Sequence, residues 1–176
     1  NTVVGDEAGT ALTTGDGNVA VGFEALKTED ANGESTAIGY QALKTQNAGI
    51  SGLNVAVGYK AGAAVTTGTI NTLIGALAGD ALTTGNSNVA VGHTALSADT
   101  LGDRNVAIGN NALAQQNFTS STDSYNVAIG YVAGGSVTTG VQNTLIGGLA
   151  GDAITTGNSN AALGYGALGS NTTADA

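Results

Sequence analysis

Short alternations of apolar and small residues recur along the whole chain, and each is closed by a glycine. The segments "NVAV" at 18–21 and "NTLI" at 71–74 are representative. A period of two is typical of β-strands, because successive side chains point to opposite faces of a sheet. A following glycine suits a corner that needs a positive φ angle or a close backbone approach. The pattern therefore predicts many short strands, each ending in a turn.

The alternations mark an internal repeat of 17 residues. Aligned on Asn-x-x-Val/Ile-Gly, the 176 residues divide into ten units, with 2 extra residues in the third unit and 4 in the seventh. A unit this short cannot bury its own apolar face, so consecutive units must stack as coils. The repeat accounts for all of 1–176, which predicts a single domain. The coils begin at Asn1, Asn18, Ser35, Asn54, Asn71, Asn88, Asn105, Asn126, Asn143 and Asn160.

One position of the repeat is always glycine. Coils are numbered here from one to ten, and positions within a coil from 1 to 17. Position 5 is glycine in every coil, and we predict a structural role for it at the turn. These glycines are Gly5, Gly22, Gly39, Gly58, Gly75, Gly92, Gly109, Gly130, Gly147 and Gly164.

Positions 9 and 12 exchange their character from coil to coil. In five coils position 9 is glycine and position 12 is apolar, as in Gly79 and Leu82. In the other five, position 9 is leucine and position 12 is polar, as in Leu96 and Asp99. These Gly coils and Leu coils follow the order Gly, Leu, Leu, Gly, Gly, Leu, Leu, Gly, Gly, Leu. We predict one interior space per coil that is filled from either position, because filling it twice overpacks the core and filling it from neither leaves a cavity.

The predicted fold is all-β, a parallel β-solenoid (β-roll) of ten coils. Seventeen residues cannot supply a helix, a strand and their turns, and "TTG" at positions 13 to 15 suggests a second short strand. With a coil spacing of about 4.8 Å, the rod is expected to be roughly 45–50 Å long. Neither end carries a recognisable capping sequence, so we expect a piece of a longer fibre.

A second exchange of volume is predicted between positions 3 and 6. Position 6 holds five of the seven aromatic residues, but it is small or short in coils one, five and nine. Those coils carry a larger residue at position 3, as in Leu73 beside Ala76. We interpret this as a trade of bulk across a subunit interface.

The composition excludes several classes of function. The formal charge is −9 with only four Lys and Arg residues, which argues against binding nucleic acid or an anionic membrane. There is no cysteine, and no apolar run approaches the roughly 20 residues of a membrane span. His93 occupies the aromatic position of its coil, so we interpret it as structural. The acidic residues Glu24, Glu29, Asp30 and Glu34 are expected on a solvated face, and no catalytic, metal or cofactor site is predicted.

Two features could carry binding. The insertions at 47–53 and 117–125 are candidate recognition loops, since loops on a rigid solenoid often cluster on one face. Phe118 and Tyr125 are the aromatic residues outside position 6 and are possible ligand contacts. Paired threonines such as Thr83 and Thr84 raise an ice-binding hypothesis, although the Leu coils interrupt the array.

The segments "NVAVGYKAG", "NVAIGNNAL" and "STAIGYQAL" resemble the head repeats of YadA-like trimeric autotransporter adhesins. They also resemble the Asn-Thr-Ala-Val/Ile-Gly-Tyr-x-Ala-Leu repeats of phage and bacterial tail-fibre-domain proteins. The resemblance covers essentially the whole chain. It implies a trimer of left-handed parallel β-rolls used for attachment, in which Val/Ile at position 4 and Gly at position 5 build the roll.

We therefore expect a non-enzymatic structural segment of an extracellular fibre, either a phage tail fibre or the shaft or head of a surface adhesin. Its expected partners are further copies of itself, as a trimer and with end-to-end contact also open, and a cell-surface glycan or receptor. The alternatives are a glycan-binding or receptor-binding module that uses the two loops, and an ice-binding solenoid. A depolymerase of the tailspike type would need a carboxylate pair in a groove.

Overall fold

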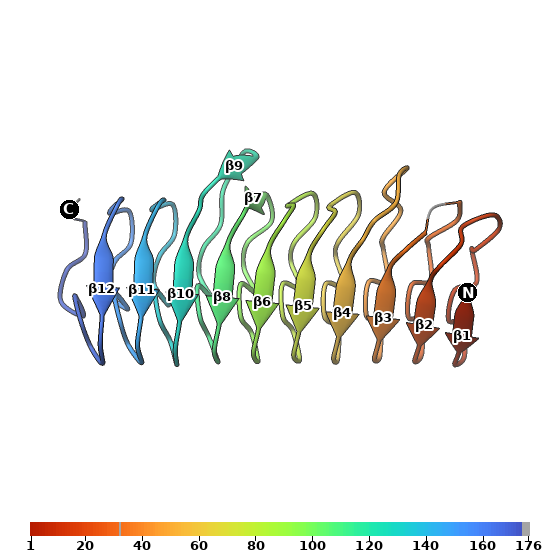
Figure 1. Cartoon of the computed structure of the whole chain (residues 1–176), viewed down its shortest axis with the longest axis horizontal. Coiled ribbons are helices and arrows are strands. Elements are labelled where there is room, and N and C mark those ends of the chain that lie inside the picture. The colour runs from red at the N-terminus through yellow and green to blue at the C-terminus, as the bar shows by residue number, and fades with distance from the viewer. Residues whose placement is uncertain (32, 174–176) are drawn as a thin grey trace.

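The chain forms a rod of stacked coils (Figure 1). The computed structural model describes residues 1–31 and 33–173, and within these residues it is all-β with no helix. One short strand per coil joins a ten-stranded parallel sheet that runs the length of the rod, so the predicted parallel β-solenoid is confirmed. Its strands are β1 (Thr2–Val4), β2 (Val19–Val21), β3 (Thr36–Ile38), β4 (Val55–Val57), β5 (Thr72–Ile74), β6 (Val89–Val91), β8 (Val106–Ile108), β10 (Val127–Ile129), β11 (Thr144–Ile146) and β12 (Ala161–Leu163).

The register of the sheet follows the repeat. Thr2 pairs with Val19, 17 residues on, and every step without an insertion keeps this spacing. Across the insertions, Thr36 pairs with Val55 and Val106 with Val127, so the extra residues leave the sheet undisturbed. Figure 1 shows both insertions rising from the same edge of the rod. In the second insertion, β9 (Thr122–Asp123) forms a small parallel pair with β7 (Gly102–Asp103) of the preceding coil.

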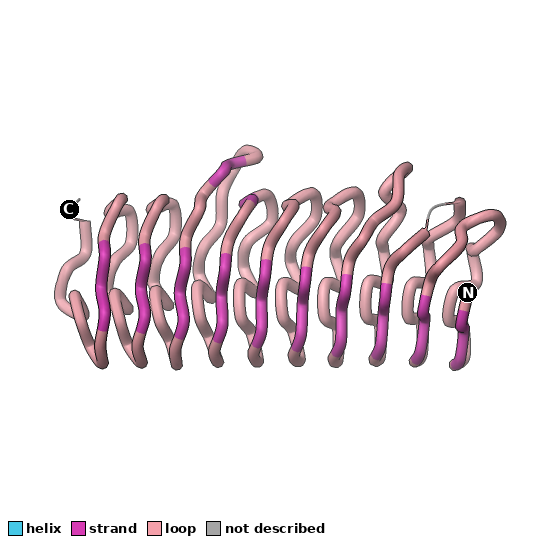
Figure 2. The backbone as a smooth tube through the Cα atoms, in the orientation of Figure 1, coloured by secondary structure: helices cyan, strands magenta, loops and turns pink. Residues whose placement is uncertain are grey.

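The predicted second strand at "TTG" is wrong. Each coil contributes one strand to the main sheet, and apart from the short strands β7 and β9 the rest of the described residues form turns and loops (Figure 2). Positions 13 to 15 still hydrogen-bond from coil to coil, as where Thr66 N–H donates to the Thr83 carbonyl at 2.9 Å and Thr83 N–H to Thr100 at 2.9 Å. The segment turns too sharply for these contacts to extend into a strand ladder.

Position 1 forms a ladder of buried asparagines from coil two to coil ten, interrupted by the buried Ser35 in coil three. Asn71, Asn88 and Asn105 are 0% exposed. The side-chain oxygen of Asn88 accepts the backbone N–H of Asn105 at 2.9 Å, and its amide donates to the Gly102 carbonyl at 2.9 Å. An aspartate in this place would offer no donor, and a leucine would offer neither group. The asparagine thus satisfies backbone groups of its own coil and of the next one, which fixes the stacking register.

The predicted interior space shared by positions 9 and 12 is confirmed. Leu82 of a Gly coil and Leu96 of a Leu coil are both 0% exposed and belong to the same core. A Cβ built on Gly79 would lie 2.9 Å from Cδ1 of Leu82. One of the two side chains would have to move to relieve such a contact, so a larger residue at position 9 would crowd Leu82 at position 12.

The predicted exchange between positions 3 and 6 is wrong. Position 3 faces the core and position 6 faces outward: Leu73 is 0% exposed, whereas Tyr59 is 49% exposed. Leu73 lies instead between the glycines of two consecutive Gly coils, since a Cβ built on Gly62 or Gly79 would lie 2.6 or 2.8 Å from its methyl groups. The bulk at position 3 therefore compensates for glycine at position 9 inside one chain.

Candidate interaction surfaces

The outward face of the sheet is a row of apolar and threonine side chains. Because position 3 points inward, positions 2 and 4 point outward, and none of them is buried. Position 2 holds only Thr, Val or Ala, and position 4 only Val, Ile or Leu, so the face carries no charge. Nine steps of about 4.8 Å make this face roughly 43 Å long. We call positions 2 and 4 of the ten strands the outer face.

Aromatic rings border the outer face at one end of the rod. Phe23 and Tyr40 stack with ring centroids 5.2 Å apart, and Tyr40 and Tyr59 stack at 5.3 Å. The amino group of Lys60 lies 5.5 Å from the centroid of the Tyr59 ring. In-register stacking places each ring over the next, which is a favourable offset geometry for aromatic pairs. The stack therefore adds a ridge of partly exposed aromatic surface beside the outer face.

Next to this ridge, an ion cluster is centred on Glu24. Its carboxylate binds Lys27 at 2.6 Å and Lys44 at 2.6 Å, accepts a hydrogen bond from Gln41 at 2.6 Å, and is nearly buried. Lys27 also pairs with Glu7. The hydrogen bonds from Lys27 and Lys44 lower the pKa of Glu24 to about 2. The cluster ties coils one to three together through their side chains.

The expectation that the acidic run faces solvent is wrong for two of its members. Glu24 is 8% and Glu29 is 0% exposed, whereas Asp30 and Glu34 are exposed as expected. Glu29 occupies position 12 of a Leu coil, which points into the core, and its carboxylate accepts a hydrogen bond from Gln46 of the next coil at 2.8 Å. The other pair of Leu coils repeats this arrangement, with Gln116 donating to Asp99 at 2.6 Å.

These two buried pairs connect to the asparagine ladder. The side-chain oxygen of Gln46 accepts the Asn54 amide at 2.8 Å, and that of Gln116 accepts the Asn126 amide at 2.7 Å. Asp99 also accepts the backbone N–H of Gly102 at 3.0 Å. The polar residue at position 12 is thus a structural group inside the rod. An acid in one Leu coil followed by Gln in the next is the sequence signal that could have revealed the pair.

Asp99 makes the stability of the rod depend on pH. Burial raises its pKa above the ordinary value, against the opposing hydrogen bonds from Gln116 and from backbone N–H groups. The folded chain therefore keeps the Asp99 proton to a higher pH than the unfolded chain, so the contribution of Asp99 to the free energy of unfolding falls as pH rises. We expect the wild type to lose stability relative to Asp99→Asn as the pH rises above the ordinary pKa of an aspartate.

Denaturant unfolding of both proteins at several pH values measures this difference. Asp30→Asn, at an exposed position of a Leu coil, is the matched control. The stability of Asp30→Asn should change with pH in parallel with that of the wild type. If the stability of Asp99→Asn also changed in parallel with that of the wild type over the whole pH range, the assignment would be contradicted.

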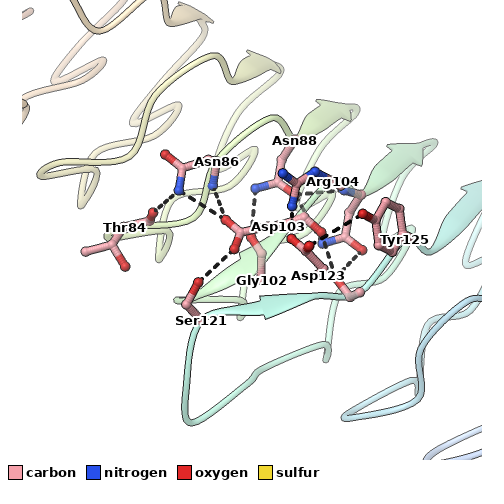
Figure 3. Close-up of polar contacts among 11 residues, drawn as sticks. Thr84, Asn86, Asn88, Gly102, Asp103, Arg104, Ser121, Asp123 and Tyr125 are labelled. Carbon is pink, nitrogen blue, oxygen red and sulfur yellow. Dashed lines mark hydrogen bonds and ion pairs between the residues drawn. The ribbon is translucent and has the colours of Figure 1, made fainter. Parts of the chain in front are cut away.

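The second insertion is held against the rod by two polar clusters (Figure 3). In the first, Asp103 accepts the backbone N–H of Asn86 at 2.6 Å and the hydroxyl of Ser121 at 2.8 Å. In the second, Arg104 pairs with Asp123 and lies 5.7 Å from the centroid of the Tyr125 ring. These contacts order the insertion, which projects from the edge of the rod.

The two aromatic residues predicted as ligand contacts lie in different environments. Phe118 is 6% exposed, so its ring is part of the packing beneath the insertion and offers no face to a ligand. Tyr125 is 48% exposed and has the Arg104 guanidinium beside its ring. In the first insertion, Ile50 and Leu53 are 65% and 48% exposed. Ligand binding by the insertions stays a prediction that centres on these exposed residues.

The threonine pairs that raised the ice-binding hypothesis use half of their hydroxyls internally. In the Gly coils, the hydroxyl of the first threonine of each pair donates to a backbone carbonyl of the next coil, as from Thr83 to Thr100 at 3.0 Å and from Thr138 to Thr155 at 3.1 Å. The second threonine, as in Thr84, is exposed. A single broken row of free hydroxyls remains, and ice binding stays a prediction without further support.

The remaining predicted residues have simple placements. His93 is exposed at position 6, where its ring nitrogen lies 3.4 Å from the Thr94 hydroxyl. At each position-5 glycine φ is positive, and a Cβ built on Gly58 would lie 2.5 Å from the carbonyl oxygen of Gly75 in the next coil. Outside Asn32 and 174–176, the chain has no cluster of three potential metal ligands and no pocket. Within the described residues there is also no helix that is long and apolar enough to span a membrane.

No protein-family model, curated protein or solved structure matches this chain.

Proposed function

We propose that the chain is a non-enzymatic structural segment of an extracellular fibre that associates side by side with further copies of itself through the outer face. One observation carries the proposal. The ten strands form an all-parallel sheet whose outward side chains are uncharged, largely apolar and not buried. All-parallel sheets are normally covered on both faces, so an exposed one of this length calls for a partner.

A copy of the same chain suits this face in three respects. The face repeats with the same strand register along the rod, so an identical rod placed beside it meets the same spacing from strand to strand. It carries no charge, although the chain as a whole has a formal charge of −9, so the repulsive groups lie elsewhere. Its β-branched side chains are stiff at χ1 and lose little freedom on burial.

The trimeric state and the role in attachment rest on the resemblance to trimeric adhesin heads and tail-fibre repeats. A trimer places three such faces around one axis, while the insertions rise from one edge of each rod. The insertions would then remain accessible to a cell-surface glycan or receptor. This arrangement matches a shaft that spaces or presents adhesive contacts outside a cell or virion.

The test is the mass of the particle in solution. We expect the chain to sediment with three times the mass of one chain, and Ile108→Lys at the middle of the outer face to sediment as a monomer that keeps its β-sheet circular dichroism. Ile108 is partly exposed in the single chain, so a lysine there is tolerated by the coil itself. Thr139→Lys, at an exposed position away from the sheet, is the matched control and should leave the trimer intact. A wild-type chain that remains monomeric at high micromolar concentration would overturn the proposal.

A further inference from the structure

Two of the 17 asparagines lie in the tripeptide Asn-x-Ser/Thr, which is the acceptor sequence for N-linked sugars. One is Asn117, followed by Phe118 and Thr119, and the other is Asn171. The asparagines of the buried ladder all lack a hydroxyl residue two places on. Because this tripeptide also recurs by chance, its place in the fold decides whether a sugar can be attached.

Asn117 stands at the start of the second insertion and is exposed. Its backbone N–H donates to the Thr138 carbonyl of the next coil at 3.0 Å, and its side-chain oxygen accepts the hydroxyl of Thr100 at 2.9 Å. Phe118 is 6% exposed and anchors the chain beneath the insertion. These contacts hold Asn117 in one place at the surface of the rod.

The two groups that the acceptor sequence supplies are both free. Among residues 1–31 and 33–173, neither Nδ2 of Asn117 nor the hydroxyl of Thr119 forms a hydrogen bond. Thr100 uses only the oxygen of the Asn117 amide, so the nitrogen that would carry a sugar has no partner to lose. Thr119 is exposed, and the insertion rises from the edge of the rod, where an enzyme can approach it (Figure 1).

Two other asparagines serve as internal comparisons. Asn171 has the acceptor sequence but occupies position 12, which points into the core at Gln46 and Gln116 of other Leu coils. Asn47 is the counterpart of Asn117 at the start of the first insertion. It is exposed, and its backbone N–H is held in the same way, but Gly49 stands where the hydroxyl residue would be.

We propose that Asn117 accepts an N-linked sugar in the folded chain, from a donor whose anomeric carbon carries a diphosphate leaving group. The new bond joins that carbon to Nδ2 of Asn117, the bond from the carbon to the diphosphate oxygen breaks, and Nδ2 gives up one of its two protons. The side-chain oxygen keeps its hydrogen bond from Thr100. This inference goes beyond the fibre role and does not depend on association through the outer face.

The test incubates the folded 176-residue chain with a soluble N-glycosyltransferase that recognises Asn-x-Ser/Thr and with a nucleoside-diphosphate hexose. Cleavage before aspartates places Asn117 in the fragment 103–122, Asn47 in 30–79 and Asn171 in 152–174. By mass spectrometry, we expect one added hexose on 103–122 and none on the other two fragments. Thr119→Ala should lose the hexose, whereas Thr119→Ser, which keeps the hydroxyl, should retain it.

A synthetic peptide of residues 112–122 measures whether the enzyme accepts this sequence outside the fold. A folded chain that stays unmodified at Asn117 while the peptide is modified would overturn the proposal. An equal yield of hexose on 103–122 in the wild type and in Thr119→Ala would also overturn it, because the acceptor sequence would then have no role.

Discussion

Gly58→Ala is expected to prevent folding or to lower the free energy of unfolding by about 4 kcal/mol. Gly58 has φ of +140°, and its Cβ would lie 2.5 Å from the carbonyl oxygen of Gly75. That oxygen belongs to the backbone of the next coil, which the parallel sheet and the asparagine ladder hold in place, so it cannot move away locally. The strained φ angle and the backbone clash therefore add. Urea unfolding monitored by circular dichroism measures the loss.

The matched control is Gly49→Ala in the first insertion. Gly49 also has a positive φ, +71°, but a Cβ built there meets nothing within 4 Å. It isolates the conformational effect, which should be about 1 kcal/mol. Similar losses at the two glycines would show that the close approach of successive coils at position 5 is not what requires glycine.

Gly79→Leu is expected to lower the free energy of unfolding by about 3 kcal/mol, although leucine is the normal residue at this position in half of the coils. The backbone does not exclude leucine: φ is +54° at Gly79 and +54° at Leu96. The new side chain would instead meet Leu82 and Leu73, whose methyl groups lie 2.9 and 2.8 Å from the built Cβ. Glycine at position 9 is therefore required for space and not for its φ angle.

Chemical denaturation gives the size of this effect. Gly166→Leu is a useful comparison, because Gly166 has φ of +63° and a Cβ there meets nothing within 4 Å. It carries the conformational strain without the overpacking. If Gly166→Leu and Gly79→Leu lost the same stability, the crowding around Leu73 and Leu82 would have no measurable consequence.

The repeat period, the parallel stacking and the shared space of positions 9 and 12 could be predicted from the sequence. Each depends on a residue pattern that recurs in all ten coils, so that the coils can be compared with one another within the one sequence. The exchange of Gly79 and Leu82 for Leu96 and Asp99 is visible because the same coil geometry must accept both pairs. Because a close-packed core has a fixed volume to fill, a larger residue at one position is matched by a smaller or polar one at the other, and this exchange is visible in the sequence.

The buried carboxylates could not be recognised from their residue type. Glu29 was expected on a solvated face, and the residue type of Asp99 gave no sign of burial, because charged side chains are almost never buried without a partner. Their partners, Gln46 and Gln116, come from the next coil at the same position and become apparent only once the coils are in register. The burial of Phe118 could not be predicted for a related reason. The insertion is not repeated in other coils, so the packing beneath it leaves no pattern in the sequence.

The positive φ angles at the other corners of the coils could not be predicted either, for a different reason. Positions 7 and 17 also adopt positive φ angles, but they carry ordinary residues, among them Val132 with φ of +55° and Ile70 with +61°. β-branched residues rarely adopt this conformation, so propensity gives no sign of it. The stacking of neighbouring coils imposes it, since the N–H of Val132 donates to the Asn110 carbonyl at 2.9 Å and that of Ile70 to Gly52 at 2.9 Å.

The central claim is that positions 9 and 12 fill one interior space, and a double-mutant cycle of Gly79→Leu and Leu82→Ala tests it most directly. Each single change should destabilise the chain, one by crowding and the other by a cavity, and the double variant should recover at least about 1.5 kcal/mol of the summed loss. Pairing Gly79→Leu with Leu145→Ala, a core leucine four coils away, should give losses that add. Additive losses for Gly79 and Leu82 as well would show that the two positions occupy separate spaces.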